Sequence, residues 1–202
     1  EPGAKIHYVG SIFGLEAKVF PVKDVWHTLL PIRGFQRGIS LQNLGRNSLL
    51  PVRIIRSMLK IRSLMNEFLP QVVVGTGGYA SALPLYMASK KNNPLPIILQ
   101  EQNSYPGMTT RWFADKAKTI CVAFNDANTH LESDTVLTGN PVRHGITYGN
   151  PLRGLKEFYL SEDQKAIFIF GCSQRSSDLN KMMSHVVANI AGAGLQILCL
   201  VG

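Results

Sequence analysis

Hydrophobic positions along the chain follow two alternating patterns. Short apolar runs at 72–74 and 97–100 have the length and branching of strands that are buried on both faces of a sheet. The segments 51–68, 81–91 and 108–116 have helical spacing instead. Two further strands are expected, at 119–123 and 135–138. This alternation predicts an α/β fold with parallel strands, because a helix that connects two adjacent strands places them parallel.

The alternation weakens after residue 143 and then begins again. Residues 1–143 are expected to form a Rossmann-like domain, 144–163 a linker rich in Gly and Pro, and 164–202 the start of a second Rossmann-like domain. The second domain is expected to contain a strand at 166–170, a helix at 179–191 and a strand at 195–201. Two strands and one helix cannot enclose a core alone, so we expect this domain to be only begun. The first domain is expected to lack its opening strand.

The first 50 residues carry a weaker pattern. Residues 5–10 are expected to form a strand, and 14–20 a short helix that stops at Pro21. Residues 25–50 contain Pro31 and several glycines and are expected to be rich in loops.

A cluster of glycines follows the strand at 72–74. Gly77 and Gly78 lack Cβ atoms, so the backbone can turn sharply there and let a ligand approach its N–H groups. The spacing is that of neither a dinucleotide fingerprint nor a phosphate loop, so neither a dinucleotide nor ATP is the expected ligand. A second polar cluster, 101–103, follows the strand at 97–100. Loops after parallel strands meet at one edge of the sheet, so this edge is the candidate ligand site.

The net charge of +8 is concentrated in one segment. Residues 33–62 contain seven Arg or Lys and no Asp or Glu. The apolar residues of the helix at 51–68 have helical spacing: Val52, Ile55, Met58, Leu59, Leu64, Met65 and Phe68. A neighbouring basic stripe contains Arg53, Arg56 and Lys60.

Three interpretations of this helix stay open. It could be a core-facing helix with a solvated basic face. It could instead form a membrane-surface patch, with Arg53, Ile55, Arg56, Met58 and Lys60 attracted to anionic headgroups. Nucleic-acid binding is disfavoured, because the segment has few aromatic residues for base stacking and no recognised motif.

Three motifs, in this order and spacing, carry a resemblance over nearly the whole chain: GTGGYAS at 75–81, EQNSYPG at 101–107 and TGNPVR at 138–143. They resemble the MurG-type UDP-N-acetylglucosamine:undecaprenyl-pyrophosphoryl-N-acetylmuramyl-pentapeptide N-acetylglucosaminyltransferases of peptidoglycan synthesis. The resemblance implies a B-type glycosyltransferase fold with two Rossmann-like domains. It also implies an inverting transfer of N-acetylglucosamine from UDP-N-acetylglucosamine to the muramyl 4-hydroxyl of lipid I, which gives lipid II. No cofactor and no metal are implied.

The resemblance also implies roles for individual residues. Thr76, Gly77, Gly78 and Tyr79 resemble the loop that receives the acceptor pyrophosphate. Asn103, Arg143, Ser173 and Gln174 resemble ligands of UDP-N-acetylglucosamine. Glu101 is a candidate catalytic residue that orients or deprotonates a hydroxyl, although the family's general base is expected upstream of Glu1. The structural alternatives are that Glu101 and Asn103 cap the following turn and that Arg143 forms an ion pair between domains.

The implied location is the cytoplasmic face of the bacterial inner membrane, as a peripheral protein, with lipid I, anionic lipid and cell-wall synthesis proteins as partners and no nucleic acid. The chain departs from the family pattern in two places. Gln100 stands where the family usually has His, and 171–176 reads GCSQRS where the family has GGSQGA. The family's glycine-rich loop with a His is expected before Glu1 and its uridine-binding region after residue 202, so this chain alone is expected to be inactive. The alternatives are a non-catalytic membrane-associated binding module and a glycolipid glycosyltransferase that acts on diacylglycerol.

Overall fold

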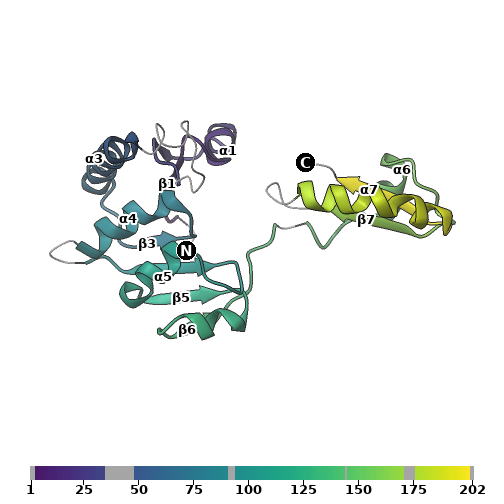
Figure 1. The fold of residues 1–202 in the computed structure, drawn as a ribbon. Coiled ribbons are helices and arrows are strands. Elements are labelled where there is room, and N and C mark those ends of the chain that lie inside the picture. Colours follow the sequence, from purple (N-terminus) through teal and green to yellow (C-terminus); the bar gives the residue numbers. More distant parts are fainter. Residues whose placement is uncertain (1–2, 35–47, 91–93, 144, 171–175, 201–202) are drawn as a thin grey trace. The chain divides into compact units, whose positions relative to one another are not determined.

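The fold was analysed in a computed structural model of the 202-residue chain, which describes all residues except 1–2, 35–47, 91–93, 144, 171–175 and 201–202. The described residues form two compact units, Glu1–Pro141 and Val142–Gly202 (Figure 1). Arg143 and the expected linker at 144–163 fall in the second unit.

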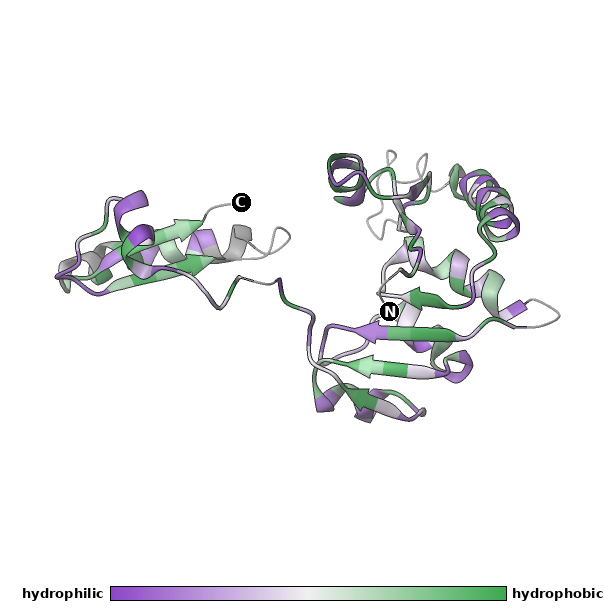
Figure 2. Cartoon of the chain, turned by 180° about the vertical axis from the view of Figure 1, so that it is seen from behind, coloured by the Kyte–Doolittle hydropathy of each residue, from purple (hydrophilic) through white to green (hydrophobic). Residues whose placement is uncertain are grey.

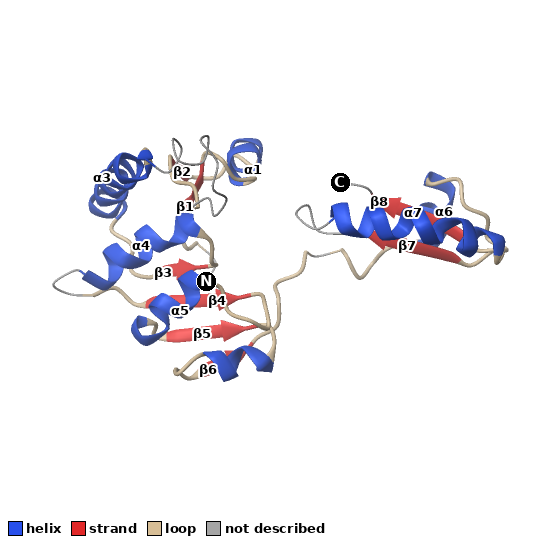
Figure 3. Cartoon of the chain, viewed as in Figure 1, coloured by secondary structure: helices blue, strands red, loops and turns tan. Residues whose placement is uncertain are grey.

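The first unit contains two parallel sheets (Figure 3). The smaller sheet pairs β1 (Tyr8–Ser11) with β2 (His27–Leu30), and α1 (Glu16–Val22) connects them. The larger sheet has the order β3-β4-β5-β6, with β3 at Val73–Gly75, β4 at Ile97–Glu101, β5 at Thr119–Val122 and β6 at Thr135–Leu137. All three of its pairings are parallel, so the carboxyl ends of these strands share one edge. The expected α/β class with parallel strands is confirmed.

The other described elements of the first unit are helices. They are α3 (Leu50–Phe68), α4 (Tyr79–Lys90), α5 (Met108–Phe113), and two short 3₁₀ helices, η1 (Ala114–Lys116) and η2 (Asn125–His130). Helix α4 packs on β3 and β4, and α3 packs on α4. The core between them consists mainly of aliphatic side chains, among them Leu30, Ile61, Leu85, Ile97, Leu99, Ile120 and Val122.

The second unit contains α6 (Pro151–Glu157), β7 (Ala166–Phe170), α7 (Ser176–Gly192) and β8 (Gln196–Leu200). Strands β7 and β8 pair in parallel, and α7 contacts β8. These three elements match the expected strand, helix and strand. Helix α6 was not expected, although Asn150 caps it by accepting a hydrogen bond from the Arg153 N–H at 3.2 Å.

Two local predictions are wrong. Helix α1 does not stop at Pro21 but runs to Val22, because the bond that closes it, from the Lys23 N–H to the Val19 carbonyl at 3.0 Å, does not need an N–H from proline. The loop-rich segment 25–50 contains β2, which ends directly before Pro31 and therefore loses no ladder hydrogen bond to it.

The core-facing interpretation of α3 holds for only part of its apolar spacing. The buried residues of the helix are Ser57, Ile61 and Met65, which recur every four positions and form one stripe. Val52, Ile55 and Leu59 are 48%, 58% and 62% exposed. Hydrophobic and hydrophilic residues alternate along the ribbon of this helix (Figure 2).

Candidate active site at the carboxyl edge of the sheet

The turn between β3 and α4 has the geometry that its glycines predict. Gly77 and Gly78 have φ angles of 85° and 76°, which L-residues with side chains rarely adopt. A Cβ at Gly78 would meet no atom within 4 Å, so the space beside it is open. Helix α4 starts at Tyr79, directly after the turn.

The carbonyl groups of this turn are all anchored by side chains. The Thr76 carbonyl accepts from Gln102 Nε2 at 3.0 Å, and the Gly77 carbonyl accepts from Ser81 Oγ at 2.7 Å. The Gly78 carbonyl accepts from Ser81 Oγ at 2.9 Å and from Thr109 Oγ1 at 3.0 Å. In a trans peptide the N–H points opposite to the carbonyl, and the described peptides are all trans. The N–H groups of Gly77, Gly78 and Tyr79 therefore point away from these anchors, which is the arrangement that an anion needs.

Glu101, the last residue of β4, is only 2% exposed and holds the next loop. Its Oε1 accepts from the Asn103 N–H at 3.1 Å and from Asn103 Nδ2 at 2.9 Å. Its Oε2 accepts from the Gly107 N–H at 2.9 Å and from Thr110 Oγ1 at 2.6 Å. Each carboxylate oxygen thus accepts two hydrogen bonds, and these bonds offset the free-energy cost of burying the charge.

Burial raises the pKa of Glu101, but the hydrogen bonds from Thr110, Gly107 and Asn103 together outweigh it and hold the pKa below its ordinary value. A buried carboxylate with a lowered pKa is a weak proton acceptor. This geometry favours the capping alternative for Glu101, and its catalytic role stays a prediction. Asn103 itself is exposed, and its bond to Glu101 leaves the side-chain carbonyl and one amide hydrogen for a ligand.

A set of side-chain amides joins the loops of the three motifs. Gln102, from the loop after β4, bonds to the glycine turn at Thr76 and also contacts the Gln100 side chain. Gln100 Nε2 donates to Asn140 Oδ1 at 3.3 Å, and Asn140 Nδ2 donates to the Gln102 carbonyl at 3.3 Å. The loops after β3, β4 and β6 are therefore linked at one edge of the sheet. Gln100, which departs from the family pattern, takes part in this link.

The other predicted UDP-sugar ligands lie elsewhere in the chain. Arg143 is exposed and belongs to the second unit. Ser173 and Gln174 lie outside the described residues. Their roles stay predictions.

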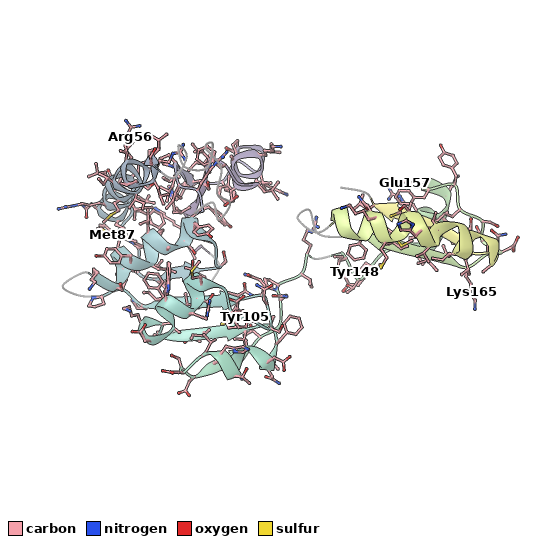
Figure 4. All side chains as sticks on the ribbon, in the orientation of Figure 1. Arg56, Met87, Tyr105, Tyr148, Glu157 and Lys165 are labelled. Atoms are coloured by element: carbon pink, nitrogen blue, oxygen red, sulfur yellow. The ribbon has the colours of Figure 1, made fainter. Side chains whose placement is uncertain are left out.

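The predicted membrane patch lies on α3. Ile55, Arg56 and Lys60 are exposed, whereas Arg53 and Met58 are half-buried. Arg56 points away from the first unit, as its label in Figure 4 shows. Among the described residues, no helix combines the length and the hydropathy that a membrane crossing requires.

Sequence reasoning missed several residues that build this edge. Ser81, Thr109, Thr110, Gln102 and Asn140 make the anchoring bonds described above. The signal for two of them is the Thr109-Thr110 pair in the first turn of α5, one residue beyond Pro106-Gly107. Within the described part of the chain, no group of three or more His, Cys, Asp or Glu is arranged to hold a metal ion.

Two curated relatives are similar to nearly all of the chain. Both carry the name UDP-N-acetylglucosamine--N-acetylmuramyl-(pentapeptide) pyrophosphoryl-undecaprenol N-acetylglucosamine transferase. The one from Bacteroides thetaiotaomicron is 38% identical over 192 residues, which are 94% of this chain and 50% of the relative. The one from Bacillus subtilis is 31% identical over 202 residues, which are 100% of this chain and 54% of the relative. The chain thus spans about half the length of the curated relatives it matches.

Two solved structures have a similar fold. Acinetobacter baumannii MurG has a TM-score of 0.56 at 20% identity, covering 98% of this chain and 57% of that one. A glycosyltransferase from Rickettsia africae has a TM-score of 0.59 at 12% identity, covering 94% of this chain and 59% of that one. The fold class expected from the sequence, that of B-type glycosyltransferases, is confirmed. The glycosyltransferase family 28 N-terminal domain matches residues 1–122, more than half of the chain, so the chain belongs to this family.

Proposed function

We propose that the full-length protein containing this chain transfers N-acetylglucosamine from UDP-N-acetylglucosamine to the muramyl 4-hydroxyl of lipid I, giving lipid II, with inversion. The names of its relatives support this reaction for the protein class. The observation that carries the proposal for this chain is the hydrogen-bonded edge where three loops meet: Gln102 ties the glycine turn to the loop after β4, and Asn140 ties in the loop after β6.

In this proposal the glycine turn receives the pyrophosphate of the acceptor. The N–H groups of Gly77, Gly78 and Tyr79 point away from the anchored carbonyls, and they start a helix whose positive dipole end attracts an anion. Donors fixed in advance stabilise a diphosphate without the cost of ordering the loop when it binds.

Asn103 would bind the donor sugar, and Glu101 would hold the Asn103 side chain in position. The bond from Asn103 Nδ2 to Glu101 fixes the rotamer of the amide, so its carbonyl and remaining N–H are presented in one orientation to sugar hydroxyls. Arg143, Ser173 and Gln174 are proposed to hold the UDP group of the donor, where a fixed positive charge favours its departure.

The protein is proposed to act as a peripheral protein at the cytoplasmic face of the inner membrane, with lipid I and anionic lipids as partners. The exposed outer stripe of α3, Val52, Ile55 and Leu59, would enter the headgroup region, and Arg56 and Lys60 would contact anionic lipids. Cell-wall synthesis proteins are proposed as further partners in this setting.

Sugar transfer in the full-length protein tests the proposed reaction. Radiolabelled UDP-N-acetylglucosamine is supplied with lipid I or with diacylglycerol as the acceptor. Label in a product that migrates as lipid II supports the proposal. Label on diacylglycerol would favour the glycolipid alternative, and no transfer by a folded protein would favour a non-catalytic module.

A further inference from the structure

Two arginines of the first unit stack on one aromatic ring. The guanidinium carbon of Arg33 lies 3.9 Å from the centroid of the Phe13 ring, and that of Arg53 lies 5.4 Å from it. Both distances are within the range of cation–π attraction. Arg33 and Arg53 are both half-buried, and Phe13 is 41% exposed, so the group is accessible from solvent.

The Ser11 hydroxyl fixes the two chain segments that bring Arg33 and Phe13 together. Ser11 Oγ donates to the Ile32 carbonyl at 2.7 Å, directly before Arg33. The same oxygen accepts from the Phe13 N–H at 3.1 Å. The ring and the first guanidinium group are therefore positioned by one side chain at the end of β1.

The positive charge of this pair is not neutralised within the described residues. No Asp or Glu occurs between Val25 and Asn66, and no described carboxylate lies within 4.0 Å of either guanidinium group. Arg53 also lies in the first turn of α3, which contains no acidic residue, and a cation is unfavourable at that end of a helix dipole. Two cations close to one ring repel each other, and an anion between or beside them would offset this repulsion.

The backbone that carries Arg33 lies next to the end of the glycine turn. A Cβ at Gly34, the residue after Arg33, would overlap the ring of Tyr79, so the backbone beside Arg33 touches the residue that ends the turn. The segment that carries Arg33 and the glycine turn are therefore neighbours in the first unit.

We propose that Arg33 and Arg53, stacked on Phe13, form an anion-binding site for the diphosphate of a polyprenyl-linked acceptor. The proposal rests on the proposed function and adds binding residues to its acceptor site. Planar guanidinium groups bind phosphate oxygens through paired N–H donors, and the ring restrains both groups before the ligand arrives. Arg53 would thus bind the acceptor, whereas the exposed Arg56 on the same helix would contact bulk lipid.

Binding of farnesyl diphosphate, a soluble polyprenyl diphosphate, to the full-length protein tests this site by calorimetry. Arg33→Gln and Arg53→Gln are each expected to weaken its binding about tenfold, the effect of losing one charge-assisted contact. Arg56→Gln is the matched control and is expected to leave the affinity within about twofold. Inorganic pyrophosphate and phosphatidylglycerol vesicles serve as the other two probes. Pyrophosphate is expected to bind more weakly than farnesyl diphosphate with the same dependence on Arg33, and vesicle binding is expected to depend on Arg56.

The results separate the site from the proposed function. The site is refuted, and the proposed function stands, if Arg33→Gln and Arg53→Gln bind farnesyl diphosphate with the same affinity as wild-type protein. The same conclusion follows if Arg56→Gln loses as much affinity as these two variants. If wild-type protein binds neither diphosphate, both fail. Circular dichroism checks each variant; should Arg33→Gln fail to fold, Arg53→Gln on the helix surface decides the result.

Discussion

A substitution at Glu101 tests directly whether its carboxylate holds the loop after β4 in place. The substitution Glu101→Gln keeps the shape of the side chain and replaces one oxygen with an NH₂ group. The remaining oxygen can still accept from Asn103. The new amide would face two donors, the Gly107 N–H and the Thr110 hydroxyl, which now bond to Glu101 at 2.9 and 2.6 Å.

The expected cost follows from these contacts. Thr110 can rotate its hydroxyl and accept from the amide, but the Gly107 N–H is left without a partner in a buried position. An unsatisfied buried donor costs about 1–3 kcal/mol, and the loss of charge adds to this. We therefore expect Glu101→Gln to lower the unfolding free energy by about 2–4 kcal/mol, a large share of the about 5–15 kcal/mol that stabilises a typical domain.

Urea unfolding of the 202-residue chain, followed by circular dichroism at pH 7, measures this cost. Glu132→Gln is the control, because Glu132 is exposed, and it is expected to change the unfolding free energy by less than about 0.5 kcal/mol. A loss below about 1 kcal/mol for Glu101→Gln would refute the reasoning.

The effect should also depend on pH. Because the pKa of Glu101 is lower in the folded than in the unfolded chain, its carboxylate stabilises the fold above the unfolded pKa, and this contribution disappears as the pH falls through the folded pKa. The difference between wild type and Glu101→Gln should therefore be complete at pH 7 and shrink below about pH 4. A difference that is the same at pH 3 and pH 7 would contradict the assigned charge.

Three further outcomes are expected. Gly78→Ala should lower the unfolding free energy by about 1–2 kcal/mol, because Gly78 has a positive φ that alanine adopts only with strain. Gly149 has no positive φ, so Gly149→Ala should not have this effect, and equal effects of the two substitutions in thermal melts would rule out backbone strain. Ser57→Ala should raise the unfolding free energy by about 1 kcal/mol, because the buried Ser57 hydroxyl has no hydrogen-bond partner among the described residues. Urea unfolding measures the change, with Ser63→Ala as the exposed control, and a lower unfolding free energy for Ser57→Ala would disprove the assigned cost of burying the hydroxyl. Ile55→Asn should weaken sedimentation with phosphatidylglycerol vesicles about tenfold if the outer stripe of α3 enters the membrane, and unchanged sedimentation would exclude that role.

The alternating pattern predicted the strands and helices well where apolar runs were bounded by strong breakers. The helix at 51–68 and the strands at 97–100 and 166–170 match α3, β4 and β7 to within one residue. The pattern failed to assign the faces of α3, because apolar residues occur on more than one side of it. Ser57 occupies the buried stripe where α3 packs on α4, while Ile55 and Leu59 face outward.

The candidate site was predictable in place but not in detail. Glycines after β3 and polar residues after β4 indicated the right edge of the sheet. That Thr110 donates to Glu101 could not be predicted, because nine residues and a turn separate them and only the folded loop brings the two side chains together. The same holds for Asn140 and Gln100, which lie 40 residues apart and meet because β4, β5 and β6 are parallel neighbours.

The central claim is that the outward N–H groups of the glycine turn bind the acceptor diphosphate. Amide chemical shifts of ¹⁵N-labelled protein during a titration with farnesyl diphosphate test it most directly. We expect the largest and saturable shifts at Gly77, Gly78 and Tyr79. Saturable binding that leaves these three amides unshifted would contradict it.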